Sequence, residues 1–412
     1  MTTDPVDRQA LVDRFDLSAL TPDFYRNPYP WYRALRELAP VRRMKNGSYF
    51  LTRYDDVVAV YKNPKAFSSD KHAEFGPKYG DSPLYRHHTT SLVFNDPPLH
   101  TRVRRLIAGA LTPRAIAGME AGLQTLVGQL LDRMSAKGEV DLIEDFASAI
   151  PIEVIGNLLA VPHDEREPLR DWSLAILGAL EPVLAPEAAQ RGNAAVTEFS
   201  AYLEGLIARR RRDPGDPAHD VLTRLIVGET GEEGNERLTP DELLHNCIFL
   251  LNAGHETTTN LIGNGLVALH DNPTQKQRLL ADPELIRPCI EEVLRYESSN
   301  QLGNRITTET VEIGGVVMPP QTQVTLCIGA ANRDPAQFAD PDKFDIGRMP
   351  NRHVAFASGI HQCAGMNLAR LEGRIALSAF LARFPDFALR GAPVRGGRAR
   401  FRGFLEIPAR LG

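Results

Sequence analysis

The chain has 412 residues, of which 43% are apolar and 24% charged, the composition of an ordinary globular protein. Its net charge of −5 excludes the strongly basic surface that binds nucleic acid, so we expect no nucleic-acid partner. The polar first ten residues do not form a signal peptide, and the most apolar stretch, 243–269, carries too many polar groups to span a membrane. We therefore expect a cytoplasmic protein without membrane contact and, since no long linker interrupts the chain, a single domain over residues 1–412.

The predicted elements are mostly helices. In the first third, residues 48–54 have strand character, and residues 55–63 indicate a helix capped by its aspartates. From 101 to 280, apolar residues recur every three or four positions, as in a series of helices. Residues 304–329 are rich in β-branched side chains and are broken by glycine and proline pairs, which predicts two short hairpin strands. A last helix over 364–384 completes a chain that is mainly α with a minor β-sheet region.

One cysteine stands out. The four cysteines are far apart and lack the spacing of a disulfide framework or a zinc site. Cys363 lies in the segment FASGIHQCAG (356–365), directly before the last helix, whose amide donors and dipole would lower the pKa of a thiol. Small residues around it leave room for a flat ring. The segment suits an axial sulfur ligand to haem iron, although a buried structural cysteine fits the local pattern equally.

A second candidate lies in the long apolar stretch, at LLNAGHETTTN (250–260). Glu256 and Thr257 place an acid and a hydroxyl in the middle of a buried helix, which is costly without a purpose. Gly254 would let a ligand approach the helix backbone, and the hydroxyl could hold water and relay protons. The alternative is structural: a threonine bonded back to its own helix and a glutamate paired with a basic neighbour.

Two further segments carry weaker signals. EEVLR puts Glu292 and Arg295 on one helical face, a common arrangement. GNGLVA (263–268) imitates a dinucleotide fingerprint, but it lies inside a predicted helix instead of between a strand and a helix. Without a nicotinamide or flavin site, electrons for a redox reaction would have to come from separate proteins.

In this order and spacing, these segments resemble the cytochrome P450 superfamily, specifically its soluble bacterial members. FASGIHQCAG resembles the family's cysteine loop, AGHETT its oxygen-activating helix and EEVLR its structural ExxR pair. DPPLHTRVRR (96–105) and ANRDPAQFADPDKFDIGR (331–348) resemble two further family segments, so the likeness covers nearly the whole chain. It implies a cytochrome P450 fold that holds haem b between a long central helix and the cysteine loop.

The resemblance also implies a role for each matching residue. Cys363 would be the proximal iron ligand, and Glu256 and Thr257 would be the catalytic pair that delivers protons while dioxygen is split. The two haem propionates would be paired by His100, Arg104, Arg305 and His361. The cofactor site would also include Ala253, Gly254 and Phe356. A buried network that shapes the cysteine side of the haem would consist of Glu292, Arg295 and Arg348.

The chain departs from the family pattern at two places. Ala357 stands where glycine is usual, a small change, and Ser299 or Asn300 stands where proline usually follows the ExxR helix. That segment normally lines the substrate pocket, whose walls we expect from residues 69–95, 172–180, 249–253 and 299–304. The first of these ranges mixes aromatic side chains with histidines, namely Phe75, Tyr79, Tyr85, His87 and His88. The pocket therefore favours a small or mid-sized apolar or aromatic substrate with one polar anchor.

The implied activity is that of a haem-thiolate monooxygenase, expected as a monomer, that inserts one oxygen atom from O2 into an organic small molecule. A ferredoxin and its ferredoxin reductase would supply the electrons, with docking candidates at Arg102, Arg105, Arg348, Arg352 and His353. A non-hydroxylating, peroxygenase-type relative would carry a different pair near the iron, and a non-catalytic haem-binding protein would not need Glu256 and Thr257. A cysteine hydrolase that used Cys363 and His361 would lack both base geometry and an orienting acid.

Overall fold

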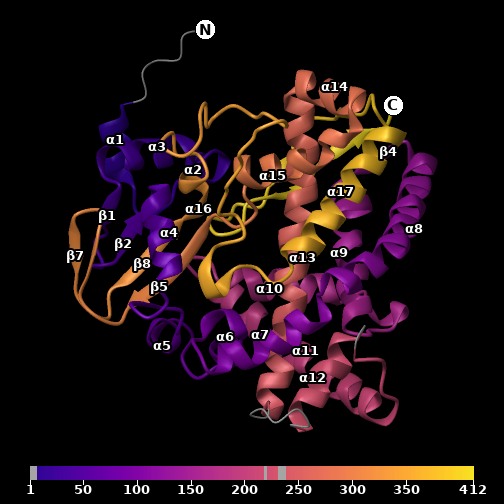
Figure 1. Ribbon diagram of the computed structural model, residues 1–412, viewed down its shortest axis with the longest axis horizontal. Coiled ribbons are helices and arrows are strands. Elements are labelled where there is room, and N and C mark those ends of the chain that lie inside the picture. Colours follow the sequence, from indigo (N-terminus) through magenta and orange to yellow (C-terminus); the bar gives the residue numbers. More distant parts are fainter. Residues whose placement is uncertain (1–6, 218–219, 231–237) are drawn as a thin grey trace.

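The computed structural model describes residues 7–217, 220–230 and 238–412, so the first six residues of the polar N-terminal segment lie outside the described part. As predicted, helices dominate this part (Figure 1). None of the described helices is long and apolar enough to cross a membrane. Up to residue 230 the helices are α1 (Arg8–Arg14), α2 (Pro22–Arg26), α3 (Tyr29–Leu38), α4 (Tyr54–Lys62), α5 (His72–Tyr79), α6 (Pro83–Thr90), α7 (Leu99–Ala110), α8 (Pro113–Lys137), α9 (Ala149–Leu158), α10 (Leu169–Gly178), α11 (Pro186–Arg212) and α12 (Val221–Thr230). They are followed by α13 (Pro240–Asp271), α14 (Pro273–Ala281), α15 (Ile286–Tyr296), α16 (Ile328–Ala331) and α17 (Met366–Arg383).

The described strands form small sheets beside the helices. The largest has the order β1-β2-β8-β5-β3, in which β2 and β8 run parallel and the other neighbours antiparallel. Its strands are β1 (Val41–Arg43), β2 (Tyr49–Leu51), β3 (Phe67–Ser68), β5 (Leu302–Thr307) and β8 (Gln323–Cys327). The smaller sheets consist of β6 (Val311–Ile313) with β7 (Val316–Met318), of β10 (Val394–Arg395) with β11 (Phe404–Glu406), and of β4 (Glu139–Asp141), β12 (Pro408–Arg410) and β9 (Ala388–Leu389).

Two local predictions need correction. Residues 304–329 contain not two strands but β6, β7, β8 and most of β5, because only β6 and β7 are close enough in sequence to pair as a hairpin around Gly314 and Gly315. Both glycines have positive φ, the conformation that such a tight turn requires. The aspartates do not cap α4 either: Arg53 is the N-cap, and Asp55 and Asp56 lie in the first turn, where they complement the helix dipole.

The long central helix α13 positions the site. It begins with a capping box in which the Thr239 hydroxyl accepts from the Glu242 amide and the Glu242 carboxylate accepts from the Thr239 amide, and Pro240 follows at the first helical position. It ends before the Asn272-Pro273 pair, because proline cannot continue a helix. The helix contacts α9, α10, α11 and α17, so most of its side chains are buried.

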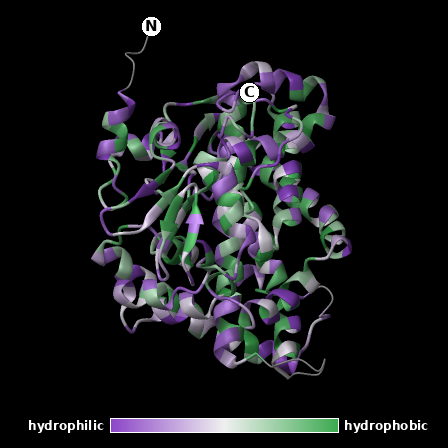
Figure 2. Cartoon of the chain, turned by 60° about the vertical axis from the view of Figure 1, so that its left-hand side comes forward, coloured by the Kyte–Doolittle hydropathy of each residue, from purple (hydrophilic) through white to green (hydrophobic). Residues whose placement is uncertain are grey.

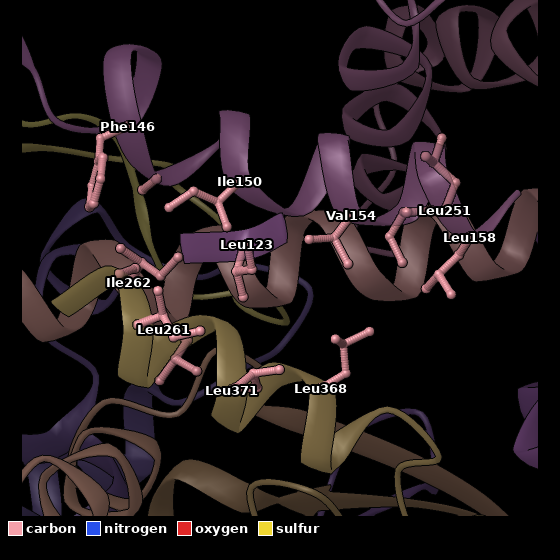
Figure 3. Packing of buried hydrophobic residues seen from close by; sticks show 14 of the residues in the cluster. Leu123, Phe146, Ile150, Val154, Leu158, Leu251, Leu261, Ile262, Leu368 and Leu371 are labelled. Carbon is pink, nitrogen blue, oxygen red and sulfur yellow. The ribbon is translucent and has the colours of Figure 1, made fainter. Parts of the chain in front are cut away.

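Apolar packing holds α13 between α9 and α17. Figure 3 shows Val154 and Leu158 of α9 beside Leu251 of α13, with Leu261 facing Leu371 of α17. In Figure 2 the outer helices show hydrophobic and hydrophilic residues side by side along their length, as expected when only one face is buried. The GNGLVA segment belongs to this packing, because a side chain at Gly265 would meet Leu377 at 2.8 Å. The glycine therefore allows close helix packing, and the prediction that this segment lies inside a helix is confirmed.

Candidate active site

A large cavity separates the cysteine loop from α13. It has an empty volume of about 2220 Å³, including the part open to solvent, and its lining includes Cys363 and Phe356 from the loop. On α13, Ala253 and Thr257 line the same cavity, and they are more exposed than the residues around them on this buried helix. The sequence prediction that the loop and the helix approach one another is confirmed. Phe356 also anchors the loop, since its carbonyl accepts a hydrogen bond from the Cys363 amide at 2.9 Å.

The electrostatics of Cys363 differ from the prediction. The expectation was a lowered pKa, but burial raises the pKa of this thiol above its ordinary value. A hydrogen bond from the Gly365 amide, which lies just before α17, and the charges of Arg104 and Arg370 oppose the effect of burial. The helix terminus does act as predicted, but the loss of water around a buried sulfur outweighs it. A bound metal ion favours the thiolate, so coordination to iron would oppose the effect of burial.

Four basic side chains line one part of the cavity, and their hydrogen-bonding capacity is incompletely used. The imidazoles of His100 and His361 lie 4.2 Å apart, and Nε2 of His361 and both ring nitrogens of His100 are buried without a hydrogen-bond partner among the described residues. Arg104 donates to the carbonyl of Gln362 at 2.6 Å, and Arg305 to that of its neighbour Asn304 at 2.7 Å. Within the described chain neither guanidinium forms an ion pair with a carboxylate.

These four side chains are suited to bind the edge of a cofactor that carries two negative charges. Burial, reinforced by the charges of Arg305, His100 and Arg104, lowers the pKa of His361 to about 2. The pocket therefore concentrates positive charge that no carboxylate of the described chain offsets at hydrogen-bonding distance. Two propionates would accept from the arginine forks and from the orphaned imidazole nitrogens, which is the donor set that the resemblance implies for haem.

The side chains of Thr257 and Glu256, the expected catalytic pair on α13, lie in two different spaces. The Thr257 hydroxyl lines the cavity and donates to the carbonyl of Ala253, one turn earlier, at 2.6 Å. Glu256 instead lies in a second, small space, where both carboxylate oxygens accept from Nη1 of Arg398 at 2.7 Å. Burial raises the pKa of Glu256, and the charge of Arg398 opposes that shift. Both contacts considered as the structural alternative are thus present, and Glu256 does not line the main cavity.

Gly254 has a packing role that the sequence did not indicate. It does line the cavity, but a side chain there would meet Cδ1 of Ile155 at 2.4 Å. The missing side chain therefore allows α9 to pack against α13, in addition to any approach by a ligand.

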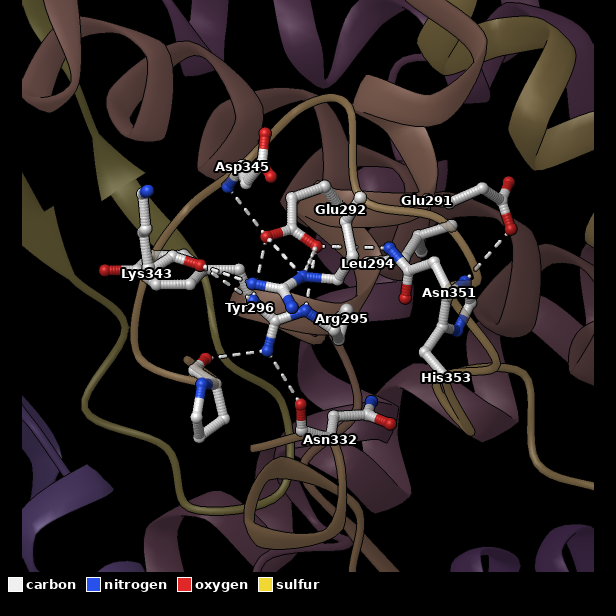
Figure 4. A network of polar contacts seen from close by, with 12 residues as sticks. Glu291, Glu292, Leu294, Arg295, Tyr296, Asn332, Lys343, Asp345, Asn351 and His353 are labelled. Carbon is white, nitrogen blue, oxygen red and sulfur yellow. Dashed lines mark hydrogen bonds and ion pairs between the residues drawn. The ribbon is translucent and has the colours of Figure 1, made fainter. Parts of the chain in front are cut away.

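The ExxR pair forms the predicted buried network (Figure 4). Arg295 donates to both oxygens of Glu292 at 2.8 Å, and both side chains are fully buried. Arg348 joins from a segment more than fifty residues later, with Nε 3.1 Å from Glu292 Oε2. The remaining donors of Arg295 reach the carbonyls of Asn332, Pro341 and Lys343. The network ties the segment before the cysteine loop to α15, so its role is to fix the loop's position.

Three of the five docking candidates are unavailable or already paired. Arg348 is held in the network, and the His353 side chain is only 3% exposed and lies 3.1 Å from Glu291. Arg102 forms an ion pair with Glu242. Arg105 and Arg352 are exposed and remain candidates.

The predicted substrate walls are largely present. Ser299 and Asn300 line the cavity, and so do Phe75, His87 and His88. Tyr79, Tyr85 and Trp172 do not line it, and Trp172 instead stacks on Phe199 at 4.9 Å. These misses arise because residues 69–95 fold largely into α5 and α6, and only part of a helix surface can face the cavity. The Tyr79 hydroxyl instead donates to the carbonyl of Ala179 at 2.7 Å.

The departures from the family pattern have visible consequences. The Ser299 hydroxyl donates to the carbonyl of Thr257 at 2.8 Å, a bond that proline could not make. Ala357 has a φ of 56°, in the left-handed region that favours glycine. Replacing glycine by alanine therefore strains the backbone more at this position than the small size of alanine suggested.

Sequence reasoning missed the charged cavity residues Glu372 and Arg400, and it did not single out Lys71 and Glu74 within the predicted range 69–95. It also missed Arg398, the partner of Glu256. A signal existed in RGGRARFRGF, where Arg398, Arg400 and Arg402 alternate at a spacing of two, as in an extended segment with one inward face. All three point to inner partners: Arg398 to Glu256, Arg400 to Asn304 and Arg402 to Glu297.

A thiol before a helix, an open patch on a facing helix and a cationic set suited to two carboxylates together define a haem-thiolate protein. A family model described as "Cytochrome P450" matches residues 37–389. The chain is 40% identical to "Cytochrome P450 107B1" of Saccharopolyspora erythraea, covering 96% of this chain and 98% of the relative. It is 38% identical to "Cytochrome P450 monooxygenase PikC" of Streptomyces venezuelae, covering 96% and 94%.

A solved structure agrees with these relatives. "P450BioI in complex with hexadec-9Z-enoic acid ligated Acyl Carrier Protein" is 35% identical, with a TM-score of 0.89 over 95% of this chain and 99% of the other. The chain belongs to the cytochrome P450 family. It is accordingly a P450 monooxygenase whose cofactor is haem b.

Proposed function

We propose that this enzyme inserts one oxygen atom from O2 into a small or mid-sized, mainly apolar or aromatic organic substrate. The observation that carries the proposal is that Cys363, Ala253 and Thr257 line one cavity whose other walls are mainly apolar. A solved relative is described in complex with an acyl carrier protein that carries a long fatty acid, which supports an apolar substrate here. Electrons would come from a separate ferredoxin and its reductase, since the chain offers no dinucleotide or flavin motif.

The residues would divide the work as follows. Cys363 would bind the haem iron, and the propionates would be held by His100, Arg104, Arg305 and His361. Ala253, Gly254 and Phe356 would complete the cofactor site. When bound, the haem supplies the redox chemistry that splits dioxygen and oxidises the substrate.

Thr257 would hold a proton donor beside the reacting oxygen. Its hydroxyl hydrogen is used by the Ala253 carbonyl, so its oxygen lone pairs remain available to accept from a water in the cavity. Glu256 lies at the preceding position of the helix but is paired with Arg398 in the second space. It would therefore pass protons only when that ion pair opens, as a gated contact to solvent.

The test is to replace Thr257 by alanine. The Thr257→Ala variant should keep its haem and its reduction by the donor, but divert electrons from product to hydrogen peroxide. Thr197→Ala is the matched control, because Thr197 also donates to the carbonyl one turn earlier, at 3.0 Å, but lines neither the cavity nor the second space. Unchanged product per electron in Thr257→Ala, or an equal loss in Thr197→Ala, would refute the proposed role.

The donor can be tested separately. Arg105 and Arg352 would attract an acidic ferredoxin, and complementary charge mainly raises the association rate. Turnover should therefore fall as ionic strength rises. Efficient turnover with peroxide alone and none with a ferredoxin would favour the peroxygenase-type alternative, and haem binding without any turnover would favour a non-catalytic haem protein.

A further inference from the structure

A second set of charged side chains lines the cavity, separate from the four assigned to the propionates. Lys71 and Glu74, at the start of α5, form an ion pair of 2.8 Å, and Lys71 is only 2% exposed. Arg400, from the segment after α17, lines the same cavity. Charged groups are rarely buried in an apolar pocket without a partner or a purpose.

Among the described residues, the guanidinium of Arg400 is bound only by neutral oxygens. It donates from Nε to the carbonyl of Leu180 at 3.2 Å, from Nη1 to that of Leu302 at 3.1 Å, and from Nη2 to Oδ1 of Asn304 at 2.5 Å. These three bonds fix the orientation of the fork, and two of its five N–H donors remain for a ligand. The nearby Glu181 carboxylate accepts instead from the main-chain amides of Ala399 and Arg400, at 2.7 and 3.1 Å.

The charges in this region do not cancel. Among the described residues whose charges act on one another here, four cations outnumber the two carboxylates of Glu74 and Glu181, so positive charge is in excess. The cations are Lys71, Lys78, Arg305 and Arg400. Burial and then the charge of Arg400 lower the pKa of Lys78 to about 8, as expected where cations crowd. The pKa of Glu74 is lowered despite its burial, because Lys71, Arg400 and Lys78 surround it.

Apolar side chains adjoin this positive group. Phe75, Leu177, Leu180 and Phe401 form one buried cluster and all line the cavity. A ligand that satisfied both features would carry one negative charge at the end of an apolar body. A ligand with a neutral head group in the same place would leave the charge of Arg400 unmatched.

We propose that Arg400, supported by Lys71, binds the carboxylate of an amphipathic substrate, of the class of medium- or long-chain carboxylic acids, whose apolar part extends toward Thr257. This inference rests on the proposed function, because it names the substrate class of the same cavity. The carboxylate would accept from the free N–H donors of Arg400 and compete with Glu74 for Lys71. The carbon that is oxidised would then be remote from the carboxylate.

The test compares two probes that differ only in their head group, dodecanoate and dodecan-1-ol. Both are titrated into the purified, haem-loaded enzyme, with the spin-state shift of the Soret band as the readout. Dodecanoate should bind at least about tenfold more tightly, since hydrogen bonds to charged groups are worth tenfold or more in affinity. Equal affinities, tighter binding of the alcohol, or binding of neither probe would overturn the proposal.

Two substitutions with opposite expected effects on dodecanoate binding, and a third that keeps the charge, make the test specific. Arg400→Gln should weaken dodecanoate binding about tenfold to hundredfold and leave dodecanol binding within a factor of about two. Glu74→Gln should tighten dodecanoate binding, because it removes the carboxylate that competes for Lys71. Arg400→Lys keeps the charge without the fork and should lie between Arg400→Gln and the wild type. A loss for both probes in Arg400→Gln, or weaker dodecanoate binding in Glu74→Gln, would refute the site.

The carbon monoxide spectrum separates this inference from the proposed function. A reduced protein without the red-shifted Soret band would refute the haem-thiolate assignment itself. A normal band together with equal binding of the two probes would refute only the carboxylate site. Arg352→Gln, an exposed arginine outside the cavity, is the matched control and should change neither affinity.

Discussion

Replacing Arg398 by methionine tests whether the buried charge of Glu256 is stabilised by this one partner. The two side chains are 17% and 8% exposed, so the variant leaves a carboxylate buried and uncompensated, at a cost of about 3–5 kcal/mol. An unfolding entropy of about 2.1 cal/mol/K per residue gives roughly 0.9 kcal/mol/K for 412 residues. The thermal midpoint of Arg398→Met should therefore fall by roughly 3–6 °C at pH 8.

The pH dependence fixes the physical cause. Burial raises the pKa of Glu256 in the folded protein above its unfolded value of about 4.3, and without Arg398 it would rise further. The destabilisation of the variant relative to the wild type therefore grows as pH rises from the folded-state pKa of the wild type to that of the variant. It should shrink when pH falls to 5.5. Differential scanning calorimetry of the holoenzyme at both pH values measures this.

A double variant is the control. Glu256→Gln combined with Arg398→Met removes the charge as well as its partner, so it should recover most of the lost midpoint at pH 8. An equal midpoint loss at both pH values, or a double variant no more stable than Arg398→Met, would refute the reasoning.

Three further outcomes are expected. Glu292→Gln leaves Arg295 and Arg348 without their shared carboxylate, so the yield of haem-loaded protein and the thermal midpoint should fall, the latter by roughly 3–6 °C; an unchanged haem-to-protein ratio and midpoint would contradict the network's role. Ala357→Gly relieves a left-handed backbone worth about 1 kcal/mol and should raise the midpoint by roughly 1 °C, whereas a glycine in an exposed helix should lower it. Arg105→Glu should slow reduction by the ferredoxin at low salt, and the difference from the wild type should vanish at high salt.

Patterns within short segments were predicted well from the sequence. Cys363 before a helix, the pair at 256–257 and the ExxR pair are each contained in a few residues, so spacing alone places them on their elements. Their order along the chain then identified the family. The burial of Glu292 and Arg295 and the cavity-facing position of Thr257 agree with that identification.

Contacts between distant segments were not predictable in this way. Arg398 lies 142 residues from Glu256, and nothing in the spacing of either indicates the other. The sequence offers His353 as a docking candidate, whereas its side chain is buried against Glu291, 62 residues earlier. The sign of the Cys363 pKa shift depended on burial, which the local helix argument left out. Each error concerns a balance between a local effect and a tertiary one, and the tertiary effect was larger.

The central claim is that Cys363 ligates the haem iron through its sulfur. The direct test is the carbon monoxide difference spectrum of the reduced protein, compared with those of Cys363→Ser and of Cys289→Ala, which changes a buried cysteine outside the cavity. We expect a strongly red-shifted Soret band in the wild type and in Cys289→Ala, and its loss in Cys363→Ser. A wild-type protein without that band, or a Cys363→Ser variant that retains it, would contradict the assignment.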